Sequence, residues 1–119
     1  SVDSVESAVS PTTVTAPSRD DAPWQAAWNE VCRAARGGDT AAAIDGCEAL
    51  LLGYPDDGLL AIEAAELHRH FGDNASSIDV LRACLSRRPN DPALLMALGD
   101  AYTFGESHAL ALPMYEAAA

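Results

Sequence analysis

The chain has 119 residues, a length that suits one ordinary domain with a single core. Acidic side chains outnumber basic ones 18 to 7, giving a formal net charge of −11, and every basic side chain is an arginine. This excess argues against nucleic acid or an anionic membrane surface as a partner, because clustered positive charge supplies most of that affinity. No apolar run approaches the roughly 18 residues that a membrane helix needs, so we expect no direct membrane insertion.

The first 22 residues differ in composition from the rest of the chain. They hold four of the six valines and contain no Leu, Ile or aromatic residue, with Ser-Pro-Thr-Thr and Ala-Pro-Ser stretches that favour an extended backbone. We therefore predict that residues 1–22 form a disordered or extended linker or tail. A folded domain is expected over residues 24–119.

Residues 24–119 have the composition of helices. They contain 21 Ala and 13 Leu but only five β-branched apolar residues. Alanine and leucine lose little entropy in a helix, whereas strands favour branched side chains. The prediction is an all-α domain.

A sequence period of about 34 residues runs through this domain. Tyr54-Pro55-Asp56-Asp57 and Arg88-Pro89-Asn90-Asp91 are the same turn, with their prolines one period apart, and Gly38-Asp39 recurs as Gly72-Asp73 at the same spacing. The period divides the domain into units of about 24–57, 58–91 and 92–119, of which the last is expected to be incomplete. Each unit is predicted to be two helices joined by a Gly turn, with Asp39 and Asp91 as N-caps.

This pattern resembles the tetratricopeptide repeat family, with W-x2-L-G-x2-Y in the first helix, A-x3-F-x2-A in the second, and then proline. The third unit matches at Leu95, Leu98, Gly99, Tyr102, Ala111, Tyr115 and Ala118. The second unit matches at Ala64, Ala65, His68, Ser77, Leu81, Cys84 and Pro89. The first unit matches at Trp28, Val31, Cys32, Ala35, Ala43, Cys47, Leu50 and Pro55, with a one-residue shift in its first helix.

The resemblance implies a right-handed α-solenoid of about three antiparallel helix pairs with a concave, peptide-binding face. In that family the groove is lined by the outward-pointing residues of each first helix. Carried onto this sequence, the groove residues are Asn29, Arg33, Arg36, Ile62, Glu66, Arg69, His70, Met96, Asp100, Thr103 and Phe104. A lysine-based clamp for a terminal carboxylate is not expected, because the chain has no lysine.

The sequence offers little that indicates catalysis or cofactor binding. His68 and His70 lie about 200° apart around a helix and so would not hold one metal ion together, and His68 falls on a core position. The three cysteines have no paired spacing, all fall on core positions and lack a neighbouring base. Phosphate-binding, hydrolase and zinc-protease motifs are absent from the sequence. We expect no enzyme activity, no cofactor and no metal.

Cys32 and Cys47 lie nearly equidistant from the turn at Asp39, on the two predicted antiparallel helices of the first unit. They are therefore expected to face each other, and to form a disulfide if the protein resides in an oxidising compartment. The last helix is expected to be covered by further repeats after Ala119 or by a second copy of the chain, since solenoids need a polar terminal cap.

The functional prediction is a non-catalytic scaffold for protein–protein interaction that binds a peptide segment in the concave groove. Its composition favours a bacterial source and an adaptor in secretion, pilus or envelope assembly, in the periplasm or the cytoplasm. Two alternatives remain at this point. One is a chaperone-like domain that sequesters a secreted subunit, and the other is a regulatory module of a larger enzyme or transcription factor.

Overall fold

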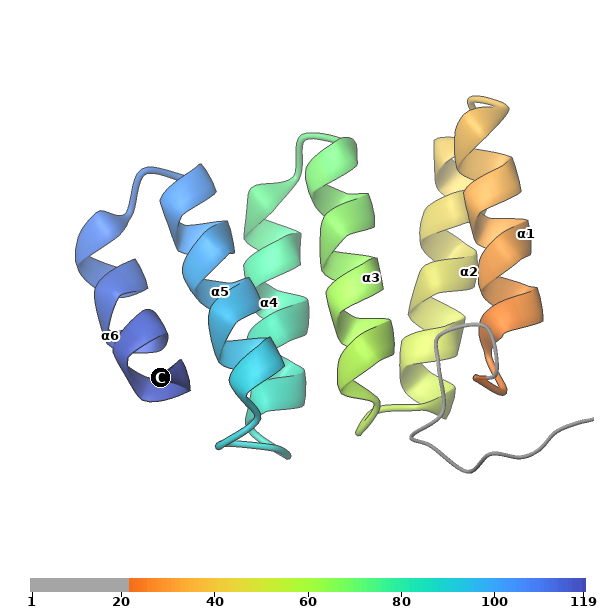
Figure 1. The fold of residues 1–119 in the computed structure, drawn as a ribbon. Coiled ribbons are helices and arrows are strands. Elements are labelled where there is room, and N and C mark those ends of the chain that lie inside the picture. The colour runs from red at the N-terminus through yellow and green to blue at the C-terminus, as the bar shows by residue number, and fades with distance from the viewer. Residues whose placement is uncertain (1–21) are drawn as a thin grey trace, which may run out of the picture.

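A computed structural model describes residues 22–119, so the predicted tail, apart from Ala22, lies outside the described residues. The described part of the chain contains six helices and no strand, which confirms the all-α prediction. The helices are α1 (Gln25–Arg36), α2 (Thr40–Gly53), α3 (Gly58–His70), α4 (Asn74–Leu85), α5 (Pro92–Phe104) and α6 (His108–Ala118). Consecutive helices pair as three antiparallel hairpins that stand side by side in one row (Figure 1).

Aspartates begin four of the six helices. The side chains of Asp39, Asp57, Asp73 and Asp91 each accept a hydrogen bond from a backbone N–H in the first turn of the following helix. Such caps satisfy amides that have no partner inside the helix. Asp39 and Asp73 are one sequence period apart, as are Asp57 and Asp91, so the sequence period is also the period of the helix starts.

The first helix of the first hairpin departs from this period. The sequence period would place the N-cap of α1 one residue before Trp24, as counted back from the N-cap Asp57 of α3. The N-cap is instead Trp24, and no side chain forms a capping hydrogen bond with α1. The one-residue shift seen in the sequence therefore corresponds to a helix that begins one position late.

Two apolar clusters hold the hairpins together, and α3 contributes to both. The first cluster joins the first two hairpins and comprises the buried residues Trp24, Trp28, Val31, Ala43, Cys47, Leu60, Ala64 and Leu67. The second joins the last two hairpins and comprises Ala61, Ala65, Leu81, Cys84, Leu94, Leu98 and Ala101. Because neighbouring positions of α3 face opposite clusters, this helix is buried on two sides and links the row into one structure.

Two glycines allow the helices of a hairpin to approach closely. A Cβ atom added to Gly99 of α5 would lie 2.6 Å from Cε1 of Tyr115 in α6. A Cβ atom added to Gly46 of α2 would lie 2.8 Å from Cγ2 of Val31 in α1. At both places a larger side chain would have to displace its neighbour.

The turns inside the three hairpins share one backbone conformation. Gly38, Gly72 and Glu106 occupy equivalent positions, each one sequence period after the last, and all have positive φ, at 86°, 80° and 63°. Glycine adopts this conformation freely, whereas a residue with a side chain is penalised by about 1–2 kcal/mol. The third turn therefore carries backbone strain that the first two avoid.

Replacing Glu106 with glycine should consequently stabilise the protein. We expect Glu106→Gly to raise the free energy of unfolding by about 1 kcal/mol, measured by urea denaturation. The matched control is Gly72→Ala, which should lower it by a similar amount because it introduces the same strain into the second turn. A loss of stability in Glu106→Gly would contradict this account of the turn.

Candidate functional site

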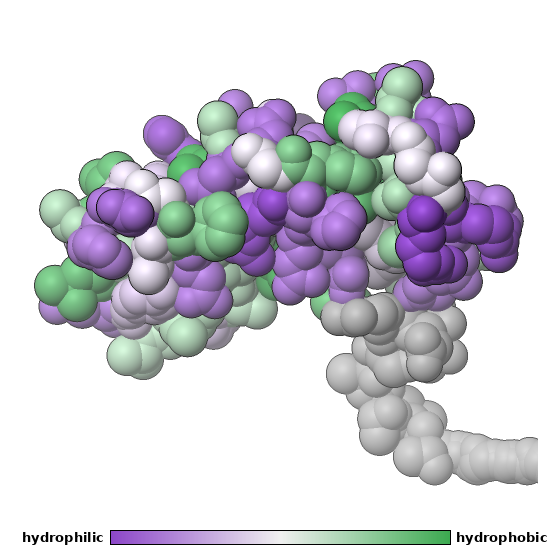
Figure 2. All heavy atoms as spheres, turned by 90° about the horizontal axis from the view of Figure 1, so that it is seen from above, coloured by the Kyte–Doolittle hydropathy of each residue, from purple (hydrophilic) through white to green (hydrophobic). Residues whose placement is uncertain are grey.

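The eleven predicted groove residues all lie on α1, α3 and α5, the first helices of the three hairpins, and none of them is buried. We call this set the first-helix surface. Seen from above, onto the turn ends of the hairpins, hydrophilic side chains gather over α1, and hydrophobic and hydrophilic side chains alternate along the rest of the row (Figure 2).

At the α1 end, the predicted residues surround a common hollow. Asn29, Arg33 and Arg36 line a pocket of about 360 Å³ together with residues of α1 and Glu63 of α3. The amide of Gln25 donates to Oδ1 of Asn29 at 2.9 Å, and Arg33 forms an exposed ion pair with Glu30. Arg33 and Arg36 bring two guanidinium groups to this hollow, where Glu63 and the ion-paired Glu30 partly balance their charge.

The α3 part of the surface is mixed. Ile62 and Arg69 are half-buried, whereas Glu66 and His70 are exposed. The ring of His70 lies 5.4 Å from that of Phe71, centroid to centroid. Ile62 also lines a separate and larger pocket, described below.

At the α5 end, large apolar side chains are open to solvent. Met96 is 46% exposed and Phe104 is 63% exposed. The polar residues between them turn toward α6, because the hydroxyl of Tyr115 donates to Oδ1 of Asp100 at 2.7 Å and lies 3.1 Å from Oγ1 of Thr103. Asp100 and Thr103 therefore brace the third hairpin, and the apolar pair is the more available contact for a partner.

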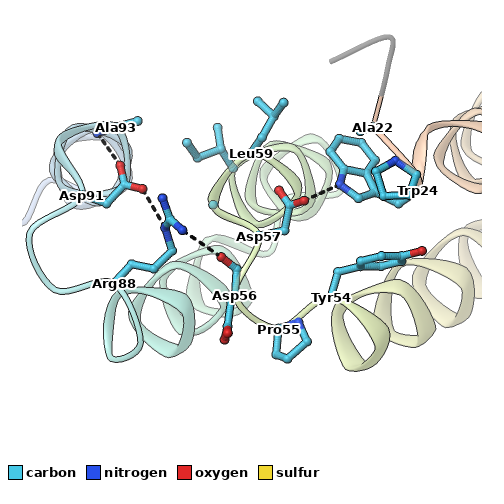
Figure 3. A pocket seen from close by; sticks show the side chains of 13 residues that line it. Ala22, Trp24, Tyr54, Pro55, Asp56, Asp57, Leu59, Arg88, Asp91 and Ala93 are labelled. Carbon is cyan, nitrogen blue, oxygen red and sulfur yellow. Dashed lines mark hydrogen bonds and ion pairs between the residues drawn. The ribbon is translucent and has the colours of Figure 1, made fainter. Parts of the chain in front are cut away.

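A pocket of about 770 Å³ lies where the first two hairpins meet the start of α5, and the sequence analysis did not identify it. Trp24, Tyr54 and Leu59 form apolar walls, and Asp57 lies between Trp24 and Arg88 (Figure 3). We call it the Trp24 pocket. Its acidic residues, Asp56, Asp57 and Asp91, all lie in the repeated turn.

Asp57 does more than cap α3. Its Oδ1 accepts the backbone N–H of Leu60 at 3.0 Å, and its Oδ2 accepts the indole N–H of Trp24 at 2.7 Å. The adjacent Asp56 caps no helix within the described residues. Its carboxylate instead pairs with Arg87 at 3.3 Å on the surface.

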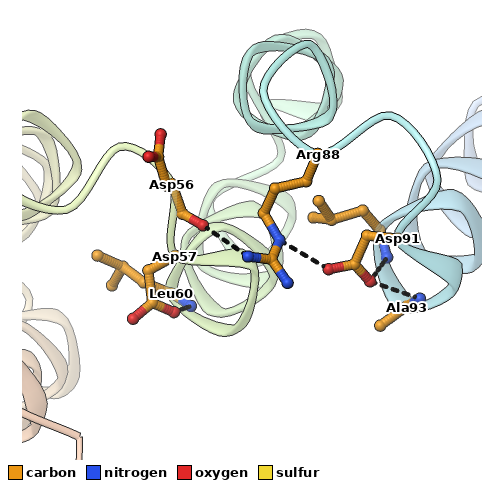
Figure 4. Close-up of polar contacts among 7 residues, drawn as sticks. Asp56, Asp57, Leu60, Arg88, Asp91 and Ala93 are labelled. Atoms are coloured by element: carbon orange, nitrogen blue, oxygen red, sulfur yellow. Dashed lines mark hydrogen bonds and ion pairs between the residues drawn. The ribbon is translucent and has the colours of Figure 1, made fainter.

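Arg88 ties the two inter-hairpin turns together. Its Nε donates to Oδ2 of Asp91 at 2.9 Å, and its Nη1 donates to the carbonyl oxygen of Asp56 at 3.5 Å (Figure 4). Burial raises the pKa of Asp91, but hydrogen bonds from Arg88 and from the backbone of Leu94 and Ala93 outweigh it, so the net pKa lies below the usual value. Asp91 is thus held ionised beside the pocket.

Burial raises the pKa of all three cysteine thiols. For Cys47, burial together with Glu48 and Cys32 raises the pKa to about 11. Protonated thiols are poor nucleophiles at neutral pH. Cys47 and Cys84 are buried as expected, whereas Cys32 is only half-buried because it lines the α1 hollow.

The Cys32–Cys47 disulfide stays a prediction. All three cysteines are free thiols here, and Cys32 packs against the cluster that contains Cys47. In oxidising buffer we expect one free thiol per unreduced chain by colorimetric titration, and stabilisation of about 3 kcal/mol relative to the reduced chain. The Cys84→Ser variant should then titrate no thiol. Three thiols in the unreduced wild type would refute the disulfide.

The remaining candidates have structural positions. His68 is 5% exposed, as its predicted core position required, and His108 begins α6. Within residues 22–119, no three His, Cys, Asp or Glu side chains are grouped so that they could hold a metal ion. None of the helices in that range is long and apolar enough to cross a membrane.

No protein-family model matches the chain, and no curated protein matches it either. The functional argument therefore depends on the geometry above.

Proposed function

We propose that the chain is a tetratricopeptide-like α-solenoid domain that binds a peptide segment of a partner protein on its first-helix surface. The periodic spacing of the helix caps and the close pairing of Gly99 with Tyr115 support the repeat assignment. The observation that carries the function is the exposure of two large apolar side chains, Met96 and Phe104, on α5. Exposed apolar groups bordered by polar ones are typical of interaction sites.

The surface has the features of a directional peptide site. An apolar side chain of the peptide would pack on Met96 and Phe104, and an acidic group would lie at the arginines of the α1 hollow. Arg69, half-buried on the central helix, would fix the register between the two ends. No residue of this surface is given a catalytic role.

A library of random peptides displayed on phage, selected against the full chain, tests this proposal. Arg69→Glu and Phe104→Ala should each weaken binding of the selected peptides by about 1–3 kcal/mol, measured by calorimetry. The helical circular dichroism signal of the protein should stay unchanged. The matched controls lie outside the surface: Arg82→Glu on α4, and Leu52→Ala on α2, where Leu52 is 84% exposed. If the selected peptides bind both test variants as tightly as the wild type, the proposal is wrong.

Self-association is a second candidate function, favoured by one observation. Leu110 and Leu112 of α6 are 55% and 58% exposed at the end of the row. A second copy packed on α6 would remove them from water. Sedimentation equilibrium of the wild type and of Leu112→Glu tests this candidate, which predicts a dimer only in the wild type.

A further inference from the structure

Within residues 22–119, Asp57 of the Trp24 pocket forms no direct ion pair, although Arg88 lies close enough for the two charges to interact. Asp57 accepts one hydrogen bond on each oxygen, from an indole and from a backbone amide. An ionised carboxylate has about four acceptor positions. Asp57 therefore keeps acceptor positions for a further donor, while its half-buried place limits how well water serves them.

The rest of the pocket suits the stem of a long basic side chain. Tyr54, Leu59 and Ile62 are half-buried and offer aromatic and aliphatic surface near the carboxylate, while Trp24 is buried behind them. Arg88 stands on the opposite side of Asp57 from the indole of Trp24, held there by Asp91 and a backbone carbonyl (Figure 3).

The charges of the pocket agree with this. Its lining holds three aspartates and one arginine, and because Asp56 also pairs with Arg87 on the surface, the formal balance is −1, in a chain of net charge −11. A basic group is drawn to such a site from a distance, and on arrival it gains a charge-assisted hydrogen bond and a cation–π contact.

We propose that the Trp24 pocket receives an arginine or lysine side chain of the bound partner segment. The charged end lies at Asp57, and the methylene stem lies along Tyr54, Leu59 and Ile62. This inference rests on the proposed function. The pocket adjoins the first-helix surface, because Ile62 belongs to both.

Two tripeptide probes test the charge requirement on the full chain. They are acetyl-Leu-Arg-Leu-amide and its citrulline counterpart, which keeps the shape of arginine and lacks its charge. Binding is followed by the NMR signal of the Trp24 indole N–H, assigned with Trp24→Phe. We expect the arginine probe to bind about tenfold more tightly, with an advantage that shrinks as salt is added. Equal affinities, or a Trp24 signal that neither probe moves, would overturn the inference.

Asp57→Asn locates the effect. Asparagine caps helices as well as aspartate does, so α3 should still begin at Gly58, although the amide nitrogen cannot accept the indole N–H of Trp24. The variant should lose about tenfold in affinity for the arginine probe and keep its affinity for the citrulline probe within about twofold. Asp45→Asn, an exposed acid of α2, is the matched control and should change neither affinity. An unchanged preference for arginine in Asp57→Asn would refute the role of Asp57.

Other occupants give distinct outcomes. Arg19 lies three residues before the pocket-lining Ala22, within reach along the chain, so Arg19→Gln is measured as well. A fivefold gain in affinity for the arginine probe in that variant would assign the pocket to the chain's own arginine and overturn binding of a partner. The two proposals can also be told apart. If Arg69→Glu and Phe104→Ala leave the affinity of the library peptides unchanged while the arginine probe still binds more tightly than the citrulline probe, the proposed function is wrong. The Trp24 pocket would then be a separate site for basic side chains.

Discussion

Leu60→Ala should lower the free energy of unfolding by about 2–5 kcal/mol. Leu60 is fully buried in α3 and belongs to the cluster that joins the first two hairpins, together with Trp24 and Trp28. The truncation removes apolar contacts and leaves a cavity between two packed hairpins that have little freedom to close it. Urea denaturation followed by circular dichroism measures the loss.

Tryptophan fluorescence adds a local measurement to the same experiment. Both tryptophans lie in the first cluster, so in Leu60→Ala their emission should change at lower urea than the circular dichroism. In Leu94→Ala, which truncates the second cluster, the tryptophan emission should not change at lower urea than the circular dichroism. Leu52→Ala, at an exposed position of α2, should stay within about 0.5 kcal/mol of the wild type. A loss below about 1 kcal/mol in Leu60→Ala would contradict the packing described here.

The sequence predicted the helices well because their signals are local. Asp39, Asp73 and Asp91 begin helices through bonds to amides two or three residues ahead, and Gly38 and Gly72 permit the turn conformation. These requirements are met within a few residues of chain. The period also located α6, although Glu106 and Ser107 have replaced the Gly-Asp pair there.

The candidate site was predicted only in part, because pockets depend on contacts between distant residues. The exposure of Met96 and Phe104 follows from which face of α5 is apolar, and that is readable from the sequence. The bond from Trp24 to Asp57 joins two separate hairpins and has no sequence signal of its own. The turn of Asp100 toward Tyr115 depends on side-chain direction, which spacing alone does not determine.

The hairpins also show how one period accommodates different side chains. Positions 65 and 81 hold Ala and Leu in the second hairpin, and the equivalent positions of the third hairpin hold Gly99 and Tyr115. The larger partner on the second helix is thus matched by a smaller residue on the first. A Cβ atom on Gly99 would lie 2.6 Å from the Tyr115 ring. The Gly99–Tyr115 pair can therefore be replaced by the Ala–Leu pair of the second hairpin only if both residues change together.

Gly99→Ala should therefore destabilise the protein although alanine is the better helix former. The helix propensity of alanine favours the variant by about 1 kcal/mol. The overlap with Tyr115 works against it by about 1–3 kcal/mol, because the ring cannot move without losing the hydrogen bonds of its hydroxyl to Asp100 and Thr103. We expect a net loss of up to about 2 kcal/mol in urea denaturation.

The double variant Gly99→Ala with Tyr115→Leu copies the pair of the second hairpin and should recover most of that loss. Tyr115→Leu alone leaves a space over Gly99 and removes the hydroxyl, so it should also be destabilising. The two changes should then be non-additive, with a coupling free energy of about 1–2 kcal/mol in the favourable direction. Strict additivity would mean that the two residues do not pack as described, and that the third hairpin is held together elsewhere along α5 and α6.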